Sequence, residues 1–173
     1  RQALEEAGLV GAVKTSGSKG VHVVVPLAPG TTTDAAAATR ALAVRAEQLH
    51  PDLTTTAYLK EDRAGKVFLD PTRVGGGTLA AVYSPRVRPG TTVSFPVAWD
   101  DLDDVTPADF TVRTVPGLLA ARPSWEEHLP APQELPAELV AEGHEIPVAR
   151  VVAMHEGKRR KRAREAETPA PEK

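Results

Sequence analysis

The chain has 173 residues, which is room for one domain of ordinary size and a short tail. Apolar residues make up 41% of it and aromatic residues only 4%, so Val, Leu and Ala must supply most of the core. Acidic and basic residues nearly balance at 23 to 21, and the absence of cysteine excludes a disulfide scaffold, a thiolate metal site and a cysteine nucleophile. No apolar run approaches the ~18 residues that a membrane helix needs, so we expect a cytoplasmic protein without a membrane partner. The chain begins with Arg1 rather than Met, so we expect a fragment, a processed chain or a piece of a longer protein.

Charge is distributed unevenly along the chain. Residues 14–88 carry ten basic and six acidic side chains, whereas the stretch 100–156 is strongly acidic. Residues 157–173 carry seven basic and three acidic side chains. A basic middle segment suits a binding site for phosphates.

The first part of the chain predicts a short helix followed by two strands. Residues 2–7 form the end of a helix that Gly8 terminates. A short strand is expected over residues 10–14. Residues 21–27 are almost continuously apolar and β-branched, which predicts a buried strand.

Helices and strands then interleave. Thr33 is expected to cap an Ala-rich helix that runs to His50 and ends at Pro51. Further strands are predicted over four short segments, at residues 67–69, 79–83, 92–97 and 110–115. This order predicts a mixed fold of the α+β or α/β class.

The composition changes after Ser124. Four prolines punctuate residues 125–156, which predicts a loosely packed extension of the domain formed by residues 1–124. Residues 157–173 predict a basic disordered tail or linker.

The segment from Lys14 to His22 is a turn of small residues between two predicted strands. Successive backbone N–H groups in such a turn can point the same way and form an anion-binding nest. Ser16 and Ser18 add hydroxyl donors, and Lys19 adds a positive charge. The alternative is an ordinary hairpin turn with an exposed lysine.

Two further segments place charged groups at predicted strands. Asp70 directly follows the strand over 67–69, where a carboxylate at a sheet edge can hold a metal. The alternative is a turn aspartate, because Pro71 follows it. Arg86 and Arg88 would share one face of an extended stretch, which suits a triphosphate or a nucleic-acid backbone between them. The alternative there is a solvated edge strand.

Together these segments resemble the polymerase domain of bacterial DNA ligase D, the end-joining primase-polymerase of the archaeo-eukaryotic primase superfamily. The similarity covers about residues 1–125 and rests on blocks that occur in the same order. They are KTSGSKGVHVVVPL at 14–27, an arginine and VFLD within 63–70, AVYSPRVRPG at 81–90, PVAWDDL at 96–102 and FTVRTVP at 110–116. The resemblance implies an α+β, primase-type palm in which helices flank a central, mostly antiparallel sheet.

The resemblance also assigns nucleotide-binding roles. Ser16, Lys19 and His22 are expected to bind the triphosphate of the incoming nucleotide, and Arg63 is expected to contact the nucleotide site. Two more arginines are expected near the nucleotide or the template. They are Arg86 and Arg88.

The implied reaction is template-directed nucleotidyl transfer, often with ribonucleotides, which fills DNA ends in bacterial non-homologous end joining. Asp70 is implied as a metal ligand and, with His22, as a catalytic residue. Such a transfer uses a pair of divalent ions ~3.5–4 Å apart. The cofactor would be Mg²⁺ or Mn²⁺, because these ions prefer carboxylate oxygens.

One carboxylate cannot hold two metal ions. The family carries its other two acids in an Asp-x-Asp motif before the serine–lysine block, and residues 1–14 contain no such pair. Asp101-Leu102-Asp103 has the same spelling but is interpreted as an acidic cluster at a helix start. We therefore expect the C-terminal part of the domain only, incomplete at its N-terminus, and leave open whether this chain alone is an enzyme. The alternative is a non-catalytic module that binds nucleotides or DNA ends, or a diverged remnant.

The basic segment near the C-terminus has two interpretations. It could contact DNA phosphates through Lys158, Arg159, Arg160, Lys161 and Arg162, or it could be a linker to a ligase or nuclease domain. The partners that the resemblance implies are a nucleoside triphosphate and 5′-phosphorylated DNA ends, together with a ligase domain or separate ligase and a bacterial end-binding Ku-type protein. Such a protein would be associated with the nucleoid.

Overall fold

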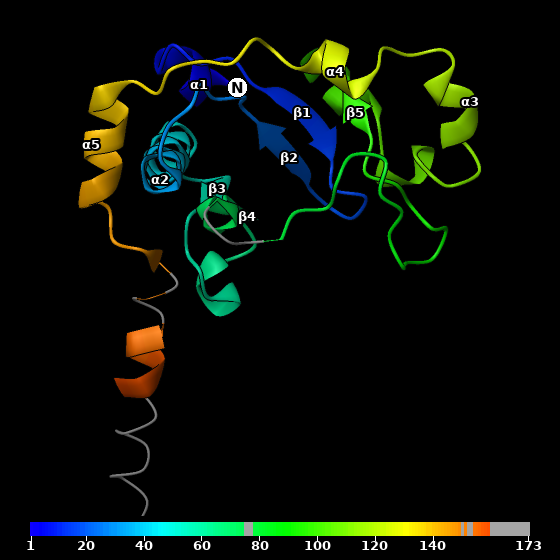
Figure 1. Ribbon diagram of the computed structural model, residues 1–173. Coiled ribbons are helices and arrows are strands. Elements are labelled where there is room, and N and C mark those ends of the chain that lie inside the picture. The colour runs from blue at the N-terminus through cyan, green and yellow to red at the C-terminus, as the bar shows by residue number, and fades with distance from the viewer. Residues whose placement is uncertain (75–77, 150, 152–153, 160–173) are drawn as a thin grey trace, which may run out of the picture. The chain divides into compact units, whose positions relative to one another are not determined.

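The computed structural model describes residues 1–74, 78–149, 151 and 154–159 (Figure 1). The chain divides into two compact units. The first unit consists of Arg1–Gly30 and Gly76–Pro136, and the second consists of Thr31–Gly75 and Ala137–Lys173. In the part of the chain that is described, no helix combines the length and the apolar character needed to cross a membrane.

A three-stranded antiparallel sheet organises the first unit. Its order is β2-β1-β5, from strands β1 (Ala12–Thr15), β2 (Val21–Val24) and β5 (Pro96–Val97). Strands β1 and β2 form a hairpin whose register places Lys14 opposite His22. The predicted first helix is present as α1 (Gln2–Glu6), and Gly8 follows it with φ +67°.

The core of the first unit lies beside this sheet. Its buried members are Val93, Phe95, Val97, Phe110 and Val115. The rings of Phe95 and Phe110 stack with centroids 4.9 Å apart, so two of the chain's few aromatic side chains form its centre. Short helices complete the unit: η3 (Trp99–Asp104), η4 (Pro107–Asp109), α3 (Val115–Leu119) and α4 (Trp125–His128).

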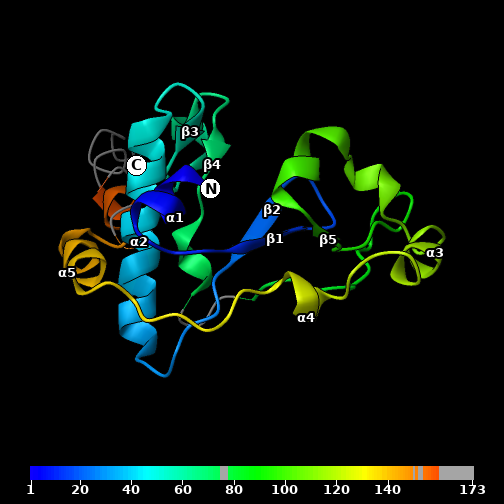
Figure 2. The same ribbon diagram turned by 90° about the horizontal axis from the view of Figure 1, so that it is seen from above.

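The second unit is built around the long helix α2 (Thr32–Leu49). A two-stranded parallel sheet joins β3 (Thr54–Thr55) to β4 (Val67–Phe68), and η1 (Lys60–Arg63) and η2 (Pro71–Arg73) flank β4 in sequence. Helix α5 (Ala137–Glu145) packs along α2, as both ribbon views show (Figures 1 and 2).

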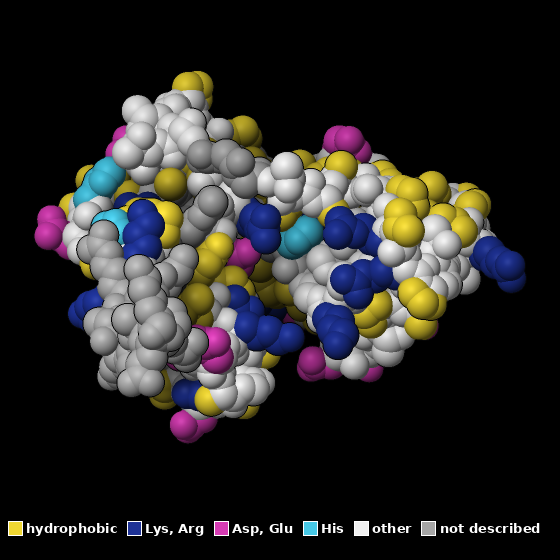
Figure 3. Space-filling view, turned by 90° about the horizontal axis from the view of Figure 1, so that it is seen from below, with side chains coloured by type: hydrophobic (Ala, Val, Ile, Leu, Met, Phe, Trp, Pro, Cys, Tyr) yellow, Lys and Arg dark blue, Asp and Glu magenta, His cyan; other side chains and the backbone are white. Residues whose placement is uncertain are grey.

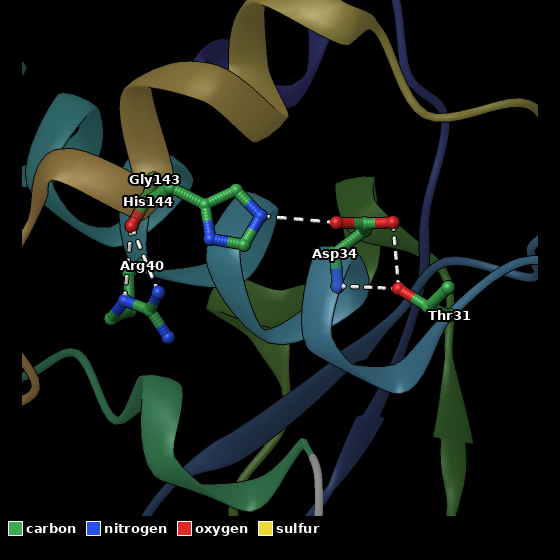
Figure 4. Close-up of polar contacts among 5 residues, drawn as sticks. All are labelled: Thr31, Asp34, Arg40, Gly143 and His144. Atoms are coloured by element: carbon green, nitrogen blue, oxygen red, sulfur yellow. Dashed lines mark hydrogen bonds and ion pairs between the residues drawn. The ribbon is translucent and has the colours of Figure 1, made fainter.

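Polar contacts and a close backbone approach fix the α2–α5 pair. The Nε and Nη2 groups of Arg40 donate to the carbonyl of Gly143, and Nε2 of His144 lies 3.0 Å from Oδ1 of Asp34 (Figure 4). A Cβ atom on Gly143 would overlap the backbone carbonyl of Ala37. The helices therefore touch at a position where only glycine fits.

The structure confirms a mixed fold with a small antiparallel sheet, but several predicted elements are wrong. Residues 79–83 form no strand, and Tyr83 adopts φ +62° while its N–H bonds to Ser94 O at 2.7 Å. Residues 110–115 are no strand either. Thr111 makes a single bridge to Thr92, and local bonds to the Thr114 hydroxyl then turn the chain into α3.

Burial and helix ends also differ from the predictions. The strand expected over residues 21–27 ends at Val24 and is not buried, because β2 lies at the sheet edge and Val21 and Val23 are each 47% exposed. The N-cap of α2 is Thr31 rather than Thr33, since the Thr31 side chain accepts the Asp34 N–H at 3.0 Å.

Within the extension predicted over residues 125–156, helix α5 is packed against α2 rather than loose. Leu139 on α5 is only 1% exposed, and Gln133 forms a bridge with Leu27 that joins this segment to the first unit. Three of the four prolines of the predicted extension lie in the connection between α4 and α5.

Candidate functional site

The hairpin turn between β1 and β2 is organised by Ser16. The Ser16 N–H donates to Gly20 O at 2.8 Å, while the Ser16 hydroxyl oxygen accepts the N–H groups of Ser18 and Gly20 at 3.2 and 3.3 Å. Two of the amides that were expected to form an anion nest therefore bind Ser16 instead. The Ser16 hydroxyl keeps its own proton, which it can donate to an anion.

Gly17 allows Arg86 to pack against this turn. It adopts φ +65°, and a Cβ at this position would lie 2.6 Å from Cγ of Arg86 and 2.9 Å from the Ser94 nitrogen. The Thr92 hydroxyl donates to Gly17 O at 2.6 Å. Arg86 and the Ser16–Gly20 turn are thus packed side by side within the first unit.

Lys14 lies beneath the turn and is 3% exposed. Its Nζ donates to Ala80 O and to Ser94 Oγ, both at 2.7 Å, and lies 2.9 Å from Nδ1 of His22. Burial, and then the charge of Arg86, lowers the pKa of Lys14 to about 8. At neutral pH the amine therefore still carries most of its charge.

Basic side chains surround this network. Lys19 is exposed at the tip of the turn, and Arg88 is exposed in the neighbouring turn, where its N–H bonds to Arg86 O at 2.8 Å. The space-filling view shows Lys and Arg side chains gathered near a histidine on the same face of the molecule (Figure 3). The cluster of Ser16, Lys19, His22 and Arg86, called the β1–β2 cradle below, combines hydroxyl, imidazole and cationic donors suited to an anion.

Asp70 belongs to the second unit and caps η2. Its Oδ1 accepts the Thr72 N–H at 3.0 Å and the Thr72 hydroxyl at 2.5 Å, and its Oδ2 accepts from Nε of Arg73 at 3.0 Å. Burial alone would raise the pKa of Asp70, but the hydrogen bonds from Thr72 and the charge of Arg73 outweigh it and hold the pKa below its usual value.

The described residues do not fit the implied metal pair. Among them, no group of three or more His, Asp or Glu side chains could hold a metal ion. Both oxygens of Asp70 already serve the turn, as the alternative interpretation of this aspartate expected. The metal-binding role of Asp70 stays a prediction.

Arg63 also lies in the second unit, with its guanidinium used inside the fold. Its Nε and Nη2 groups donate to the carbonyls of Ala57 and Tyr58 at 3.0 and 2.7 Å. Its Cζ lies 3.7 Å from the centre of the Phe68 ring, a cation–π contact. The predicted nucleotide contact of Arg63 stays a prediction.

The C-terminal basic segment is only partly described. Lys158 and Arg159 are exposed. The other three predicted DNA contacts, Arg160, Lys161 and Arg162, lie outside the described residues, as does most of the tail predicted over 157–173.

Sequence analysis missed the residues that support the cradle. Lys14, Thr92 and Ser94 were not singled out, although Lys14 lies in the block that was. The signal for Lys14 was available, because a hairpin turning over residues 16–20 pairs position 14 with position 22. Ser94 is fully buried and gives no such signal.

A model of the family described as "LigD, primase-polymerase domain" matches residues 1–125 of the chain. The chain therefore belongs to this family, and the resemblance stated above is confirmed. A solved structure of the polymerase domain from Mycobacterium tuberculosis ligase D in complex with DNA matches with a TM-score of 0.67 and 38% identity. This match covers 75% of the present chain and 46% of the solved one.

Curated relatives give the same result. The multifunctional non-homologous end joining DNA repair protein LigD of Mycobacterium tuberculosis is 42% identical over 106 residues, which is 60% of this chain and 14% of the relative. The multifunctional LigD of Pseudomonas aeruginosa is 32% identical over 142 residues, 79% of this chain and 17% of the relative. The bifunctional LigD of Bacillus subtilis is 32% identical over 119 residues, 66% and 20% respectively. The chain thus spans a fifth or less of these relatives.

Proposed function

We propose that this chain binds the triphosphate of an incoming nucleotide at the β1–β2 cradle and acts as part of an end-joining primase-polymerase. The observation that carries the proposal is the packing of Arg86 against Gly17, next to the Ser16 turn and the Lys14–His22 pair. Separate sequence motifs are thereby joined into one surface of donors. Membership of the LigD primase-polymerase family supports this choice of ligand.

The chemistry of the cradle suits a polyphosphate. Lys19 and Arg86 offer charge-assisted hydrogen bonds, and the guanidinium can bind two oxygens at once. The Ser16 hydroxyl and the His22 imidazole add shorter-range donors that fix orientation. Arg88 is proposed to continue this surface toward a nucleic-acid backbone.

The activity we propose for the complete domain is template-directed nucleotidyl transfer that fills DNA ends during non-homologous end joining. The described residues do not supply a metal-binding group. We propose instead that the acids required for transfer are completed by sequence outside this chain, which covers 46% of the solved polymerase domain. We propose that Asp70 contributes one of these acids, which requires its carboxylate to release its bonds to Thr72 and Arg73.

A second candidate function is a non-catalytic module that binds nucleotides or DNA ends. It is favoured by the state of Asp70, whose carboxylate serves as a cap and ion-pair partner within its own turn. The two candidates share the cradle and differ in whether transfer occurs.

We propose DNA ends with a 5′-phosphate as the second ligand, since the solved polymerase domain that the chain resembles is a complex with DNA. Lys158 and Arg159 are exposed and could add sequence-independent phosphate contacts. A ligase domain or separate ligase and a Ku-type end-binding protein are proposed as partners, with nucleoid association following from them.

Nucleotide binding is the first test. ATP titrated into the full chain should bind, and Lys19→Ala and Arg86→Ala should each weaken binding about tenfold, because each removes a charge-assisted bond worth ~1.5 kcal/mol. Lys66→Ala is the matched control, since Lys66 is exposed and its Nζ donates to Pro51 O in the second unit. Binding that is insensitive to both cradle variants contradicts the proposal.

Primer extension separates the two candidates. The chain is supplied together with the part of a LigD polymerase domain that it does not match, with a primed template, nucleotide and Mn²⁺. Extension that disappears in Asp70→Ala supports transfer, whereas nucleotide binding without extension supports the binding module. Extension that survives Asp70→Ala refutes the role proposed for this carboxylate.

A further inference from the structure

We propose that Lys14 is a positioning residue, whose ammonium holds the His22 imidazole in the tautomer that carries its proton on Nε2. The proposal rests on the function proposed above only in taking His22 as a residue of the cradle. The assignment of the tautomer stands on the geometry around Lys14.

The direction of each hydrogen bond at Lys14 can be worked out from its neighbours. Ala80 O can only accept. Ser94 Oγ donates its own proton to Thr15 O at 2.6 Å, so it must accept from Nζ of Lys14 at 2.7 Å. Two of the three ammonium protons are therefore assigned, and the third faces Nδ1 of His22 at 2.9 Å.

A charged Lys14 thus fixes the protonation of His22. An ammonium has no lone pair and cannot accept from Nδ1–H, so Nδ1 must be the acceptor and the neutral ring must carry its proton on Nε2. The pKa of about 8 places Lys14 largely in the ammonium form at pH 7. The neighbouring charge that acts on Lys14 is that of Arg86, which has the same sign.

The surrounding sheet holds this pair in place. Lys14 and His22 are directly opposite in the β1–β2 register, and the neighbouring bond from Thr15 N to Phe95 O at 2.8 Å connects β1 to the segment that carries Ser94. Ser94 is fully buried and Lys14 nearly so. The Lys14 ammonium is therefore held in one position, from which its hydrogen bond can orient the His22 imidazole.

A purely structural role explains Lys14 poorly. Its three partners are a carbonyl, a hydroxyl and an imidazole, and none of them is a carboxylate. Burying a charge without a counter-charge is costly, whereas an apolar side chain would fill the same space at no such cost. A role that needs the charge, such as control of the imidazole, accounts for its presence.

The test reads the tautomer directly. The full chain is labelled with ¹⁵N-histidine, and two-bond ¹H–¹⁵N spectra are recorded at pH 7, with His22→Gln used to assign the His22 signals. We expect a protonated Nε2 and an unprotonated Nδ1 in the wild type. The protonation state itself is read in the wild type, and a proton on Nδ1 there overturns the proposal.

Variants then test the cause. Lys14→Met should shift the His22 ring nitrogens toward a mixture of tautomers, whereas Ser94→Ala, which disturbs the same cluster but leaves the ammonium, should preserve Nε2–H. The chain has no cysteine, so the variant Lys14→Cys contains a single thiol. Alkylation of this thiol by 2-bromoethylamine displaces bromide and restores an ammonium group at position 14. Recovery of the Nε2–H signal after alkylation supports the proposal, and an unchanged tautomer in Lys14→Met overturns it.

ATP titration distinguishes this inference from the proposed function. If ATP binds and Lys14→Met weakens it about as much as His22→Gln, with no further loss in the double variant, Lys14 acts through His22. Fully additive losses overturn the positioning role while leaving the proposed function intact. If ATP does not bind at all, the proposed function fails, and the tautomer measurement alone decides the role of Lys14.

Discussion

The buried amine of Lys14 gives the fold a pH dependence that can be calculated and measured. Its pKa falls from 10.5 in the unfolded chain to about 8 in the folded one, because burial and the charge of Arg86 disfavour the ammonium. Between these values the unfolded chain binds a proton that the folded chain does not, so stability rises with pH in this window. Below pH 8 both states are protonated and the cost of the buried charge is fully present.

The size of the effect follows from the same shift. Each pH unit between the two pKa values is worth ~1.4 kcal/mol, so Lys14 should raise the free energy of unfolding by about 3 kcal/mol between pH 8 and pH 10.5. The measurement is urea unfolding followed by tryptophan fluorescence. The fluorescence reports on the unit that contains Lys14, because Trp99 and Trp125 both lie in the first unit.

The Lys14→Met variant provides the reference. Contributions that are common to both proteins cancel in the difference. The free energy of unfolding of the wild type minus that of Lys14→Met should therefore be flat below about pH 7, begin to rise as pH approaches 8 and rise most steeply across pH 8–10.5. A difference that is flat or falls above pH 8 would refute the reasoning.

Three further predictions follow from close contacts and ion pairs. Gly143→Ala should lower the free energy of unfolding by at least ~2 kcal/mol, since its Cβ would overlap the α2 backbone and force the helices apart, and urea unfolding measures the loss. Gly17→Ala should destabilise the first unit by ~1–2 kcal/mol and also weaken ATP binding, because φ is +65° and the new Cβ would press on Arg86; unchanged ATP affinity would show that the contact is irrelevant to the cradle. The pKa of Asp34 is lowered by the Thr31 hydroxyl and then by His144, so its stabilising contribution is complete above the usual carboxyl pKa and is lost as pH falls through the lowered value. Acid unfolding of Asp34→Asn should therefore be less steep than that of the wild type.

The hairpin at the cradle was the most predictable part of the fold. Two β-branched segments around a Ser-Gly turn specify both the turn and its register, and the register alone pairs Lys14 with His22. The long helix was equally clear, and only its ends were misplaced, by two residues at the N-cap and one at the C-terminus. Thr31 and Thr33 are equivalent in type, and the choice between them depends on which hydroxyl reaches the Asp34 amide.

The remaining elements depend on contacts between residues that are distant in sequence. The segment at 110–115 has a strand-like composition, but Phe110 is drawn into a stack with Phe95 and the threonines that follow bond to one another. Helix α5 was missed because prolines precede it, and its stability comes from packing Leu139 and Gly143 against α2. For the site, the sequence could place a lysine in the right block but could not show that Ser94, 80 residues away, holds it.

The position of β2 has a practical consequence. This strand ends the three-stranded sheet, and Val21 and Val23 are half exposed on it. An apolar edge strand is a template onto which a second molecule can add its own strand, and this can cause aggregation. Charged substitutions at these two valines are therefore the first choice for keeping concentrated samples of the chain monodisperse.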